Sequence, residues 1–231
     1  MTYATLLVNL EAGRSNEHLL QTAAEVAERF GAGVIGVAAC QAMQMVYGDG
    51  YAYADMLEQD RLDIAKEVEE TEAEFHAALQ SRVRVLEWRS AVLVTSLSEH
   101  VAFEARRADL IPTDAGPTKA FDATRQTHTG DLVMQAGRPV LVVTPAPLKL
   151  DRVLLAWKDT RETRRAAADA LLLLRKARHV CIVEMADEAD LPEVRRRLAD
   201  VAGWLGKHGV EAECLGTAST GGRSEAAERH R

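Results

Sequence analysis

The sequence has few of the features that would place this 231-residue chain in a membrane or outside the cell. No apolar run approaches the roughly 20 residues that a membrane-spanning helix needs, so we expect no membrane association. The amino terminus has no basic segment before its first apolar residues, which argues against a signal peptide. The three cysteines are widely spaced, which excludes a disulfide framework and indicates thiols in a reducing compartment. We therefore expect a cytoplasmic protein.

The chain also has too little positive charge for a general nucleic-acid binder. Its 28 Lys and Arg residues are outnumbered by 35 Asp and Glu residues, giving a formal charge of −7. A protein that binds nucleic acid normally presents a basic face, so we expect no nucleic-acid partner. The local run Arg195-Arg196-Arg197 fits the solvated side of a helix.

Motifs of common enzyme classes are missing as well. The chain has no Gly-x-Ser-x-Gly elbow, no Gly-x4-Gly-Lys-Ser/Thr phosphate loop, and no Cys-x2-Cys or His-x3-His pair. Of the seven histidines only His128 lies near a candidate binding loop, where a solvated loop residue is the simpler interpretation. Asp109 and Asp131 suggest a carboxylate pair, but we expect Asp109 at the start of a strand, far from that loop. We expect no catalytic residues, no metal site and no enzymatic activity.

The stretch Thr129–Thr144, TGDLVMQAGRPVLVVT, predicts a short helix that returns directly into a strand. Thr129-Gly130-Asp131 opens the helix, and Gly137-Arg138-Pro139 ends it, because Gly accepts a left-handed conformation and Pro cannot continue a helix. The apolar run at 140–143 then predicts a strand with both faces covered, as in a parallel sheet between helix layers. In such sheets, anionic ligands usually bind at the carboxyl ends of the strands.

Upstream, the alternation of apolar patterns predicts parallel βαβ units. We expect strands at 5–10, 34–40 and 82–88, a long helix at 54–81, a short helix at 96–107, and a fourth strand from 108. Pro112 lacks an amide hydrogen, so we expect it at the exit of that strand. The loop at 41–53 contains two glycines, three tyrosines and two methionines. It either covers a ligand or partner, or packs on its own aromatic residues.

The same alternation begins again at Asp151. Residues 153–157 resemble residues 5–9 at an offset of 148 positions, and a helix, a strand at 179–185, a helix from about Asp190 and a strand at 210–215 follow. This order predicts an internal repeat that stops after three strands. We accordingly divide the chain into a complete domain at 1–147, a partial second domain at 148–219, and a tail at 220–231 whose composition predicts disorder.

Three segments resemble the universal stress proteins in their tandem bacterial arrangement: GDLVMQAGRPVLVV at 130–143, AWKDTRETRRAAADAL at 156–171 and RRADLI at 106–111. The resemblance implies an α/β fold with an open parallel five-stranded sheet, of order 3-2-1-4-5 and with helices on both faces. A partial second copy of this domain would follow. The resemblance also implies pairing through the last strands, so we expect a homo-oligomer; any other protein partner is unidentified.

Many members of that family bind ATP through a Gly-x2-Gly-x9-Gly-Ser/Thr pattern after the fourth strand and an Asp that ends the first strand. Mapped onto this chain, the resemblance implies a degenerate nucleotide site. Its members would be Asn9, Val37, Gly116, Gly130 and Asp131.

This pattern is degenerate at four positions. Two of its glycines fall on Pro117 and Ala120, Asp131 replaces the Ser or Thr, and Asn9 replaces the acid. A carboxylate beside a phosphate about 4 Å away costs roughly 4 kcal/mol at an effective dielectric constant near 20. We therefore expect no tight ATP binding and no other cofactor. The chain is interpreted as a non-catalytic stress-response protein that acts through self-association or partner binding. An ATP- or AMP-binding sensor is the alternative, and a nucleotide hydrolase a more distant one.

Overall fold

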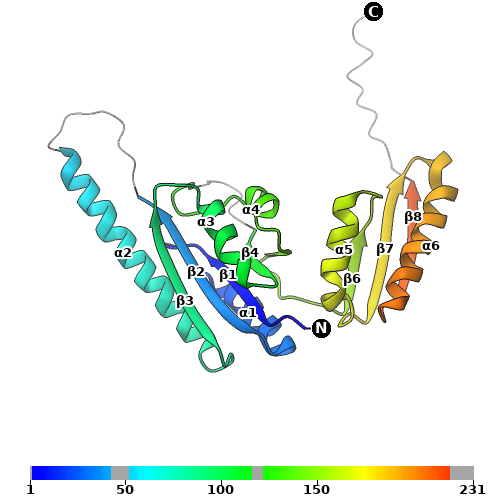
Figure 1. The fold of residues 1–231 in the computed structure, drawn as a ribbon, viewed down its shortest axis with the longest axis horizontal. Helices are drawn as coiled ribbons and strands as arrows, with labels where there is room; N and C mark the ends of the chain where they lie inside the picture. Colours follow the sequence, from blue (N-terminus) through cyan, green and yellow to red (C-terminus); the bar gives the residue numbers. More distant parts are fainter. Residues whose placement is uncertain (1, 43–51, 116–121, 219–231) are drawn as a thin grey trace, which may run out of the picture. The chain divides into compact units, whose positions relative to one another are not determined.

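The structure is a computed structural model that describes residues 2–42, 52–115 and 122–218. The chain divides into two compact units, Met1–Leu148 and Lys149–Arg231. The first unit contains a five-stranded sheet and the second a three-stranded sheet (Figure 1). The loop at 43–51, most of the segment expected to cover a ligand or partner, and the tail expected at 220–231 lie outside the described residues.

The first unit is a parallel sheet of order β3-β2-β1-β4-β5, which confirms the predicted fold class and strand order. Helices alternate with the strands along the chain. The elements are β1 (Thr5–Leu10), α1 (Glu17–Phe30), β2 (Gly33–Gln41), α2 (Ala52–Leu79), β3 (Leu86–Leu93), α3 (Leu97–Glu104) with the 3-10 turn η1 (Ala105–Arg107), β4 (Ile111–Asp114), α4 (Thr129–Gln135) and β5 (Val140–Val143). None of the helices in the described ranges is long and apolar enough to cross a membrane.

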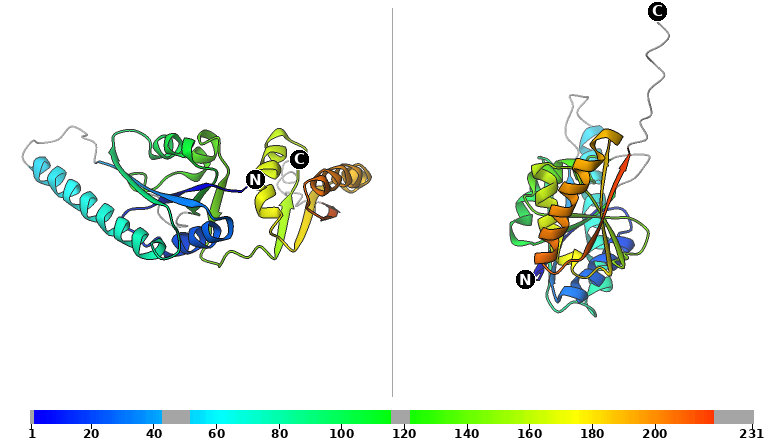
Figure 2. Two further views of the ribbon diagram at one scale, coloured as in Figure 1. Left: turned by 60° about the horizontal axis from the view of Figure 1, so that its bottom comes forward. Right: turned by 90° about the vertical axis from the view of Figure 1, so that its right-hand side faces the viewer.

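Helices cover both faces of this sheet, as the left view of Figure 2 shows. Leu7, Ile35 and Val37 point toward α3 and α4, where they form a buried cluster with Val101, Ala105, Ala108, Ile111 and Leu132. On the other face, the sheet has to accommodate aromatic rings from α2 and β3. A Cβ added to Gly36 would lie 2.8 Å from the ring of Phe75 and 2.9 Å from that of Trp88, so this strand position requires glycine.

The predicted helix-to-strand return is present in the first unit. α4 begins at Thr129, and Gly137 adopts a left-handed φ of 58° before β5. The prediction that both faces of β5 are covered is wrong, because β5 lies at the edge of the sheet and Val142 is 45% exposed.

Two strand predictions also need correction. β3 begins at Leu86 rather than at residue 82, because Arg82 belongs to the preceding turn, where its Nε donates to Glu28 Oε1 at 2.7 Å. Pro112 lies inside β4 rather than at its exit. The N–H of Ile111 donates to the carbonyl of Pro139 on the β5 side, so Pro112 turns its missing donor toward β1. Pairing between β1 and β4 is accordingly interrupted at this point.

The second unit repeats the element order of the first three strands and two helices. Its parallel sheet has the order β6-β7-β8. That it is a partial copy of the first unit stays an interpretation. The elements are β6 (Arg152–Ala156), α5 (Arg161–Leu174), β7 (His179–Ala186), the 3-10 turn η2 (Glu188–Asp190), α6 (Leu191–Lys207) and β8 (Ala212–Ala218).

The offset of 148 between the two units is wrong by one residue. It pairs Leu155 with Leu7, but Leu155 packs into the cluster formed with α5 and α6, whereas Leu7 faces α3 and α4. A slip of one residue along a strand moves every side chain to the opposite face. An offset of 147 aligns Thr5 with Arg152, the first residues of β1 and β6, and restores the match of faces.

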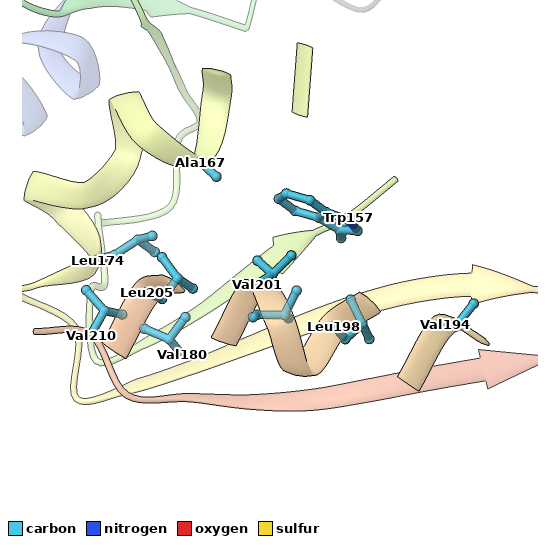
Figure 3. Close-up of a cluster of buried hydrophobic side chains, with 10 residues drawn as sticks. Trp157, Ala167, Leu174, Val180, Val194, Leu198, Val201, Leu205 and Val210 are labelled. Carbon is cyan, nitrogen blue, oxygen red and sulfur yellow. The ribbon is translucent and has the colours of Figure 1, made fainter. Parts of the chain in front are cut away.

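Within the described residues of the second unit, helices cover one face of its sheet. Figure 3 shows the covered face, where Leu198, Val201 and Leu205 of α6 meet side chains of the strands and of α5. The other face carries large exposed apolar side chains, one from each strand. These are Leu154 at 63% exposure, Met185 at 64% and Leu215 at 52%.

Candidate functional site

The predicted site residues lie around the carboxyl ends of the strands of the first unit. Asn9 in β1 is the register partner of Val37 in β2 and of Thr113 in β4. Gly130 and Asp131 lie in the first turn of α4. Gly116 lies outside the described residues. The strands thus bring Asn9 and Val37 side by side.

The side chains of Asn9 and Val37 are closed in by the chain itself. Asn9 is 3% exposed, and its Nδ2 donates to Thr113 Oγ1 at 3.0 Å. Its Oδ1 accepts from Thr127 Oγ1 at 3.3 Å. Val37 has no exposed surface. A ligand would reach these two side chains only after the segment that contains Thr127 moved.

Sequence reasoning missed Glu11, which is the first residue after β1. Its side chain is buried, and Arg14 Nη1 donates to its Oε2 at 2.8 Å. Burial raises the pKa of Glu11; Arg14 lowers that pKa in part, and the nearby charge of Asp114 raises it further. Glu11 fits the description of an acid at the end of the first strand better than Asn9 does. The available signal was its place directly after the apolar run of β1.

Residues 122–128 are fastened across the end of β2 by Arg125, whose side chain is 13% exposed. Its Nε donates to Glu67 Oε2 at 2.6 Å, and its Nη2 to Asp60 Oδ1 at 3.4 Å. The N–H of Gln41 in β2 also donates to the carbonyl of Thr124 at 2.7 Å. Burial lowers the pKa of Arg125, but the hydrogen bond and charge of Glu67 outweigh burial and raise it overall. This guanidinium is therefore committed to two carboxylates of α2.

The start of α4 is occupied by its own side chains. His128 is the N-cap residue, and its Nδ1 accepts from the N–H of Asp131 at 3.3 Å. The carboxylate of Asp131 lies 3.4 Å from the same nitrogen, and both side chains are more than half exposed. Gly130 packs closely on the imidazole, since an added Cβ would lie 3.1 Å from His128 Cε1. The exposure predicted for His128 is confirmed, and the capping role is new.

Asp109 lies at the amino ends of the strands, the opposite end from Asp131, as predicted. Its Oδ2 accepts from the N–H groups of Ala4 and Thr5, at 2.8 and 3.1 Å, where β1 begins. The two aspartates therefore do not form a carboxylate pair. Among the described residues, no group of three or more His, Cys, Asp or Glu side chains is arranged to hold a metal ion.

Comparison with solved structures identifies the fold. A universal stress protein from Archaeoglobus fulgidus DSM 4304 aligns with 94% of this chain and 79% of its own, at a TM-score of 0.64 and 14% identity. The chain has the fold of the universal stress proteins. The resemblance seen in the sequence is thus confirmed at the level of the fold. No family model matches the chain, and a search of curated proteins also finds no match.

Shorter universal stress proteins align with part of the chain. One from A. fulgidus in complex with dAMP covers 62% of this chain and 100% of its own, at 18% identity and a TM-score of 0.44. The protein UspA from Lactobacillus plantarum covers 62% of this chain and 99% of its own, at 17% identity and a TM-score of 0.43. At these TM-scores neither likeness decides what this chain binds.

Proposed function

We propose that this chain is a non-catalytic, cytoplasmic stress-response protein that acts through self-association and does not bind ATP tightly. The observation that carries the second part is the position of Arg125. Its guanidinium is buried between Glu67 and Asp60, and it holds residues 122–128 across the end of β2. The segment after the fourth strand, which the family resemblance assigns to phosphate binding, is thereby tied to α2.

The charges that surround the strand ends support the same proposal. Glu11 follows β1, Asp114 ends the neighbouring strand β4, and Asp131 lies at the beginning of α4. A phosphate brought to these strand ends would meet carboxylates, while Arg14 and Arg125, in the segments after β1 and before α4, already pair with acids. Like charges a few ångströms apart cost several kcal/mol when partly shielded from water, which is enough to remove micromolar affinity.

Titration calorimetry with Mg²⁺-ATP, and separately with AMP, tests the absence of tight binding. We expect no saturable heat up to about 1 mM nucleotide. Asp131→Ser should strengthen any residual binding, because it removes a negative charge and adds a hydroxyl donor. Asp187→Ser, an exposed acid of the second unit, should leave binding unchanged. A micromolar dissociation constant for the native chain would favour the nucleotide-sensor alternative.

The self-association part of the proposal is supported by the second sheet. Its uncovered face carries Leu154, Met185 and Leu215, each more than half exposed, and β6 is an edge strand of that sheet. An edge strand with unpaired backbone groups recruits another strand, and a contiguous apolar patch recruits another surface. A second copy of the chain supplies both.

Sedimentation velocity over a range of concentrations tests self-association. We expect the native chain to sediment as an oligomer and Leu154→Glu to shift it toward monomer, because the variant places a charge on the apolar face. Met134→Glu is the matched control, since Met134 is 85% exposed on α4 and belongs to the first unit. A native chain that stays monomeric at all concentrations, or a Leu154→Glu variant that associates normally, would contradict the proposal.

A further inference from the structure

The second unit contains a cavity of about 510 Å³ near the end of β6, between the start of α5 and the middle of α6. Its volume suits a small organic molecule. The apolar part of its wall comes from two indoles and one aliphatic side chain, and the rest from charged groups. The lining residues are Trp157, Asp159, Arg164, Arg197, Asp200, Val201 and Trp204.

The lining contains two arginines and two aspartates, and their ion pairs decide which charge faces a ligand. Arg164 Nη1 lies 2.9 Å from Asp159 Oδ1, so these two charges neutralise each other. Arg197 donates through Nη2 and Nε to the buried carboxylate of Glu184, at 2.7 and 3.2 Å. Among the lining acids, Asp200 is therefore the carboxylate that no arginine of the wall compensates. Because Arg197 is engaged by Glu184 from outside the lining, Asp200 is the charge that remains to face a ligand, which favours a cation.

The aromatic walls suit the same kind of ligand. An organic cation is attracted to the face of an indole by the ring quadrupole, and a nearby carboxylate adds to that attraction. Trp157 is 8% exposed and packs beside Val201, as Figure 3 shows. Its Nε1 is buried and has no hydrogen-bond partner among the described residues. A buried indole N–H normally finds an acceptor, so the Trp157 N–H is a donor left unused at the wall of this cavity; Trp88 Nε1 is unpaired in the same way but does not line the cavity.

The equivalent groove of the first unit, a cavity of about 350 Å³ between the start of α1 and the middle of α2, has a different lining. There Glu74 of α2 accepts from the N–H of Asn16 at 2.9 Å and from Ser15 Oγ at 3.2 Å, which joins α2 to the start of α1. In the second unit, Thr160 caps α5 from its own loop by accepting from the N–H of Thr163 at 3.3 Å. The α6 wall presents Val201 and Trp204 toward the cavity in place of a bridging carboxylate. The two indoles thus distinguish this cavity from that of the first unit, whose α2 wall carries Glu67, Glu70 and Glu74.

We propose that this cavity binds a small organic cation with an aromatic or aliphatic body. The two indoles hold the body, and Asp200 faces the positive charge. An acceptor atom on the ligand adds a hydrogen bond to the Trp157 N–H. This inference does not depend on the proposed function, because it concerns a different site and a different class of ligand.

Two-dimensional ¹H–¹⁵N spectra of the full chain test the proposal through its three indole N–H resonances, from Trp88, Trp157 and Trp204. Trp157→Phe and Trp204→Phe assign them. The probes share one body and differ in charge: benzyltrimethylammonium, benzyl alcohol and benzoate. We expect saturable shifts of the Trp157 and Trp204 resonances, and not of Trp88, with a dissociation constant of about 1 mM for the cation. Benzyl alcohol should bind about tenfold more weakly, and benzoate more weakly still.

Asp200→Asn should weaken binding of the cation about tenfold and leave that of benzyl alcohol unchanged. Asp200 is exposed, so the variant should fold normally, which circular dichroism checks. Glu211→Gln is the control, because it removes an exposed carboxylate at the opposite edge of the same sheet. Equal binding of benzoate and the cation, an Asp200→Asn variant with native affinity, or no saturation with the cation up to about 50 mM would each overturn the proposal.

Discussion

The two sheets of this protein begin with the same order of elements and end in different states of coverage. In the first unit, Leu7, Ile35 and Val37 are at most 4% exposed, because α3 and α4 cover the face to which they point. In the second unit no α3 or α4 counterpart occurs within the described residues, and Leu154 and Met185 on the corresponding face are more than 60% exposed.

This difference shows that the strands do not by themselves decide which faces are buried. Both units have parallel strands with apolar residues on both faces, a pattern typical of sheets between two helix layers. Where the second layer is present, the pattern produces a closed core. Where the described part of the unit has no second layer, the same pattern leaves an exposed apolar surface. The comparison therefore predicts a stable first unit and a second unit whose stability depends on what covers it.

The largest difference in stability is expected between the two units when each is expressed as a separate fragment. Residues 1–148, expressed alone, should retain a cooperative thermal transition, because they contain the whole five-stranded sheet and both helix layers. Residues 149–231 alone should unfold with a free energy of at most about 3 kcal/mol at low concentration, since a core of this size supplies little more. Differential scanning calorimetry measures both.

The concentration dependence of the smaller fragment sharpens this test. Its transition should move to higher temperature as concentration rises, because association covers the apolar face. The full chain provides the reference. A first unit that lacks a cooperative transition, or a second unit as stable as the first in a monomeric sample, would remove the basis of the comparison.

Glycine substitutions should have smaller effects, destabilising in the first unit and stabilising in the second. Gly36→Ala should destabilise the first unit by about 1–3 kcal/mol, because the added methyl lies within 3 Å of the rings of Phe75 and Trp88. Gly203→Ala should stabilise the second unit by roughly 0.5–1 kcal/mol, because Gly203 lies inside α6 with open space around its Cα. Urea unfolding measures both changes, and a neutral Gly36→Ala would show that the first core is looser than the structure indicates.

The sequence predicted the parts of the fold that depend on local pattern. The apolar runs of β1 and β2, the left-handed Gly137 and the strand order implied by the family resemblance are all confirmed. Features that depend on tertiary neighbours were not predictable. The exposure of Val142 follows from the edge position of β5, and Arg82, placed in the turn after α2, pairs with Glu28 of α1 instead of entering β3. Neither has a signature within a single segment.

The candidate site was predicted less completely than the fold. Asn9, Val37, Gly130 and Asp131 were placed near the correct end of the sheet, but the motif gave no sign of Arg125, whose partners lie 58 and 65 residues away. The offset between the units was also mistaken by one, since apolar residues at consecutive strand positions match almost equally well in either register. Burial on a particular face distinguishes the two registers, and only the structure supplies it.

The smallest expected change in stability concerns the residues that follow the first strand of each unit, β1 and β6. The corrected offset aligns buried Glu11 with exposed Lys158. Burial raises the pKa of the Glu11 carboxyl above its usual value of 4.5, so the folded chain binds this proton more tightly than the unfolded chain. The corresponding stabilisation is present at low pH and is lost as the pH rises through the raised pKa. Glu11→Gln should therefore gain stability relative to the native chain as the pH increases.

We expect that gain to reach about 1 kcal/mol or less at pH 7, because the lost contact with Arg14 opposes it, and to vanish near pH 4. Lys158→Gln should change the free energy of unfolding by less than about 0.5 kcal/mol at either pH, as for most exposed positions. Urea unfolding measures both: Trp88 reports on Glu11→Gln in a background where Phe replaces Trp157 and Trp204, and Trp157 and Trp204 report on Lys158→Gln in a background where Phe replaces Trp88. A Glu11→Gln variant that loses stability as the pH rises would mean that the pairing with Arg14 outweighs the cost of burial. The ionised Glu11 carboxylate would then stabilise the first unit, and its burial would carry no net cost.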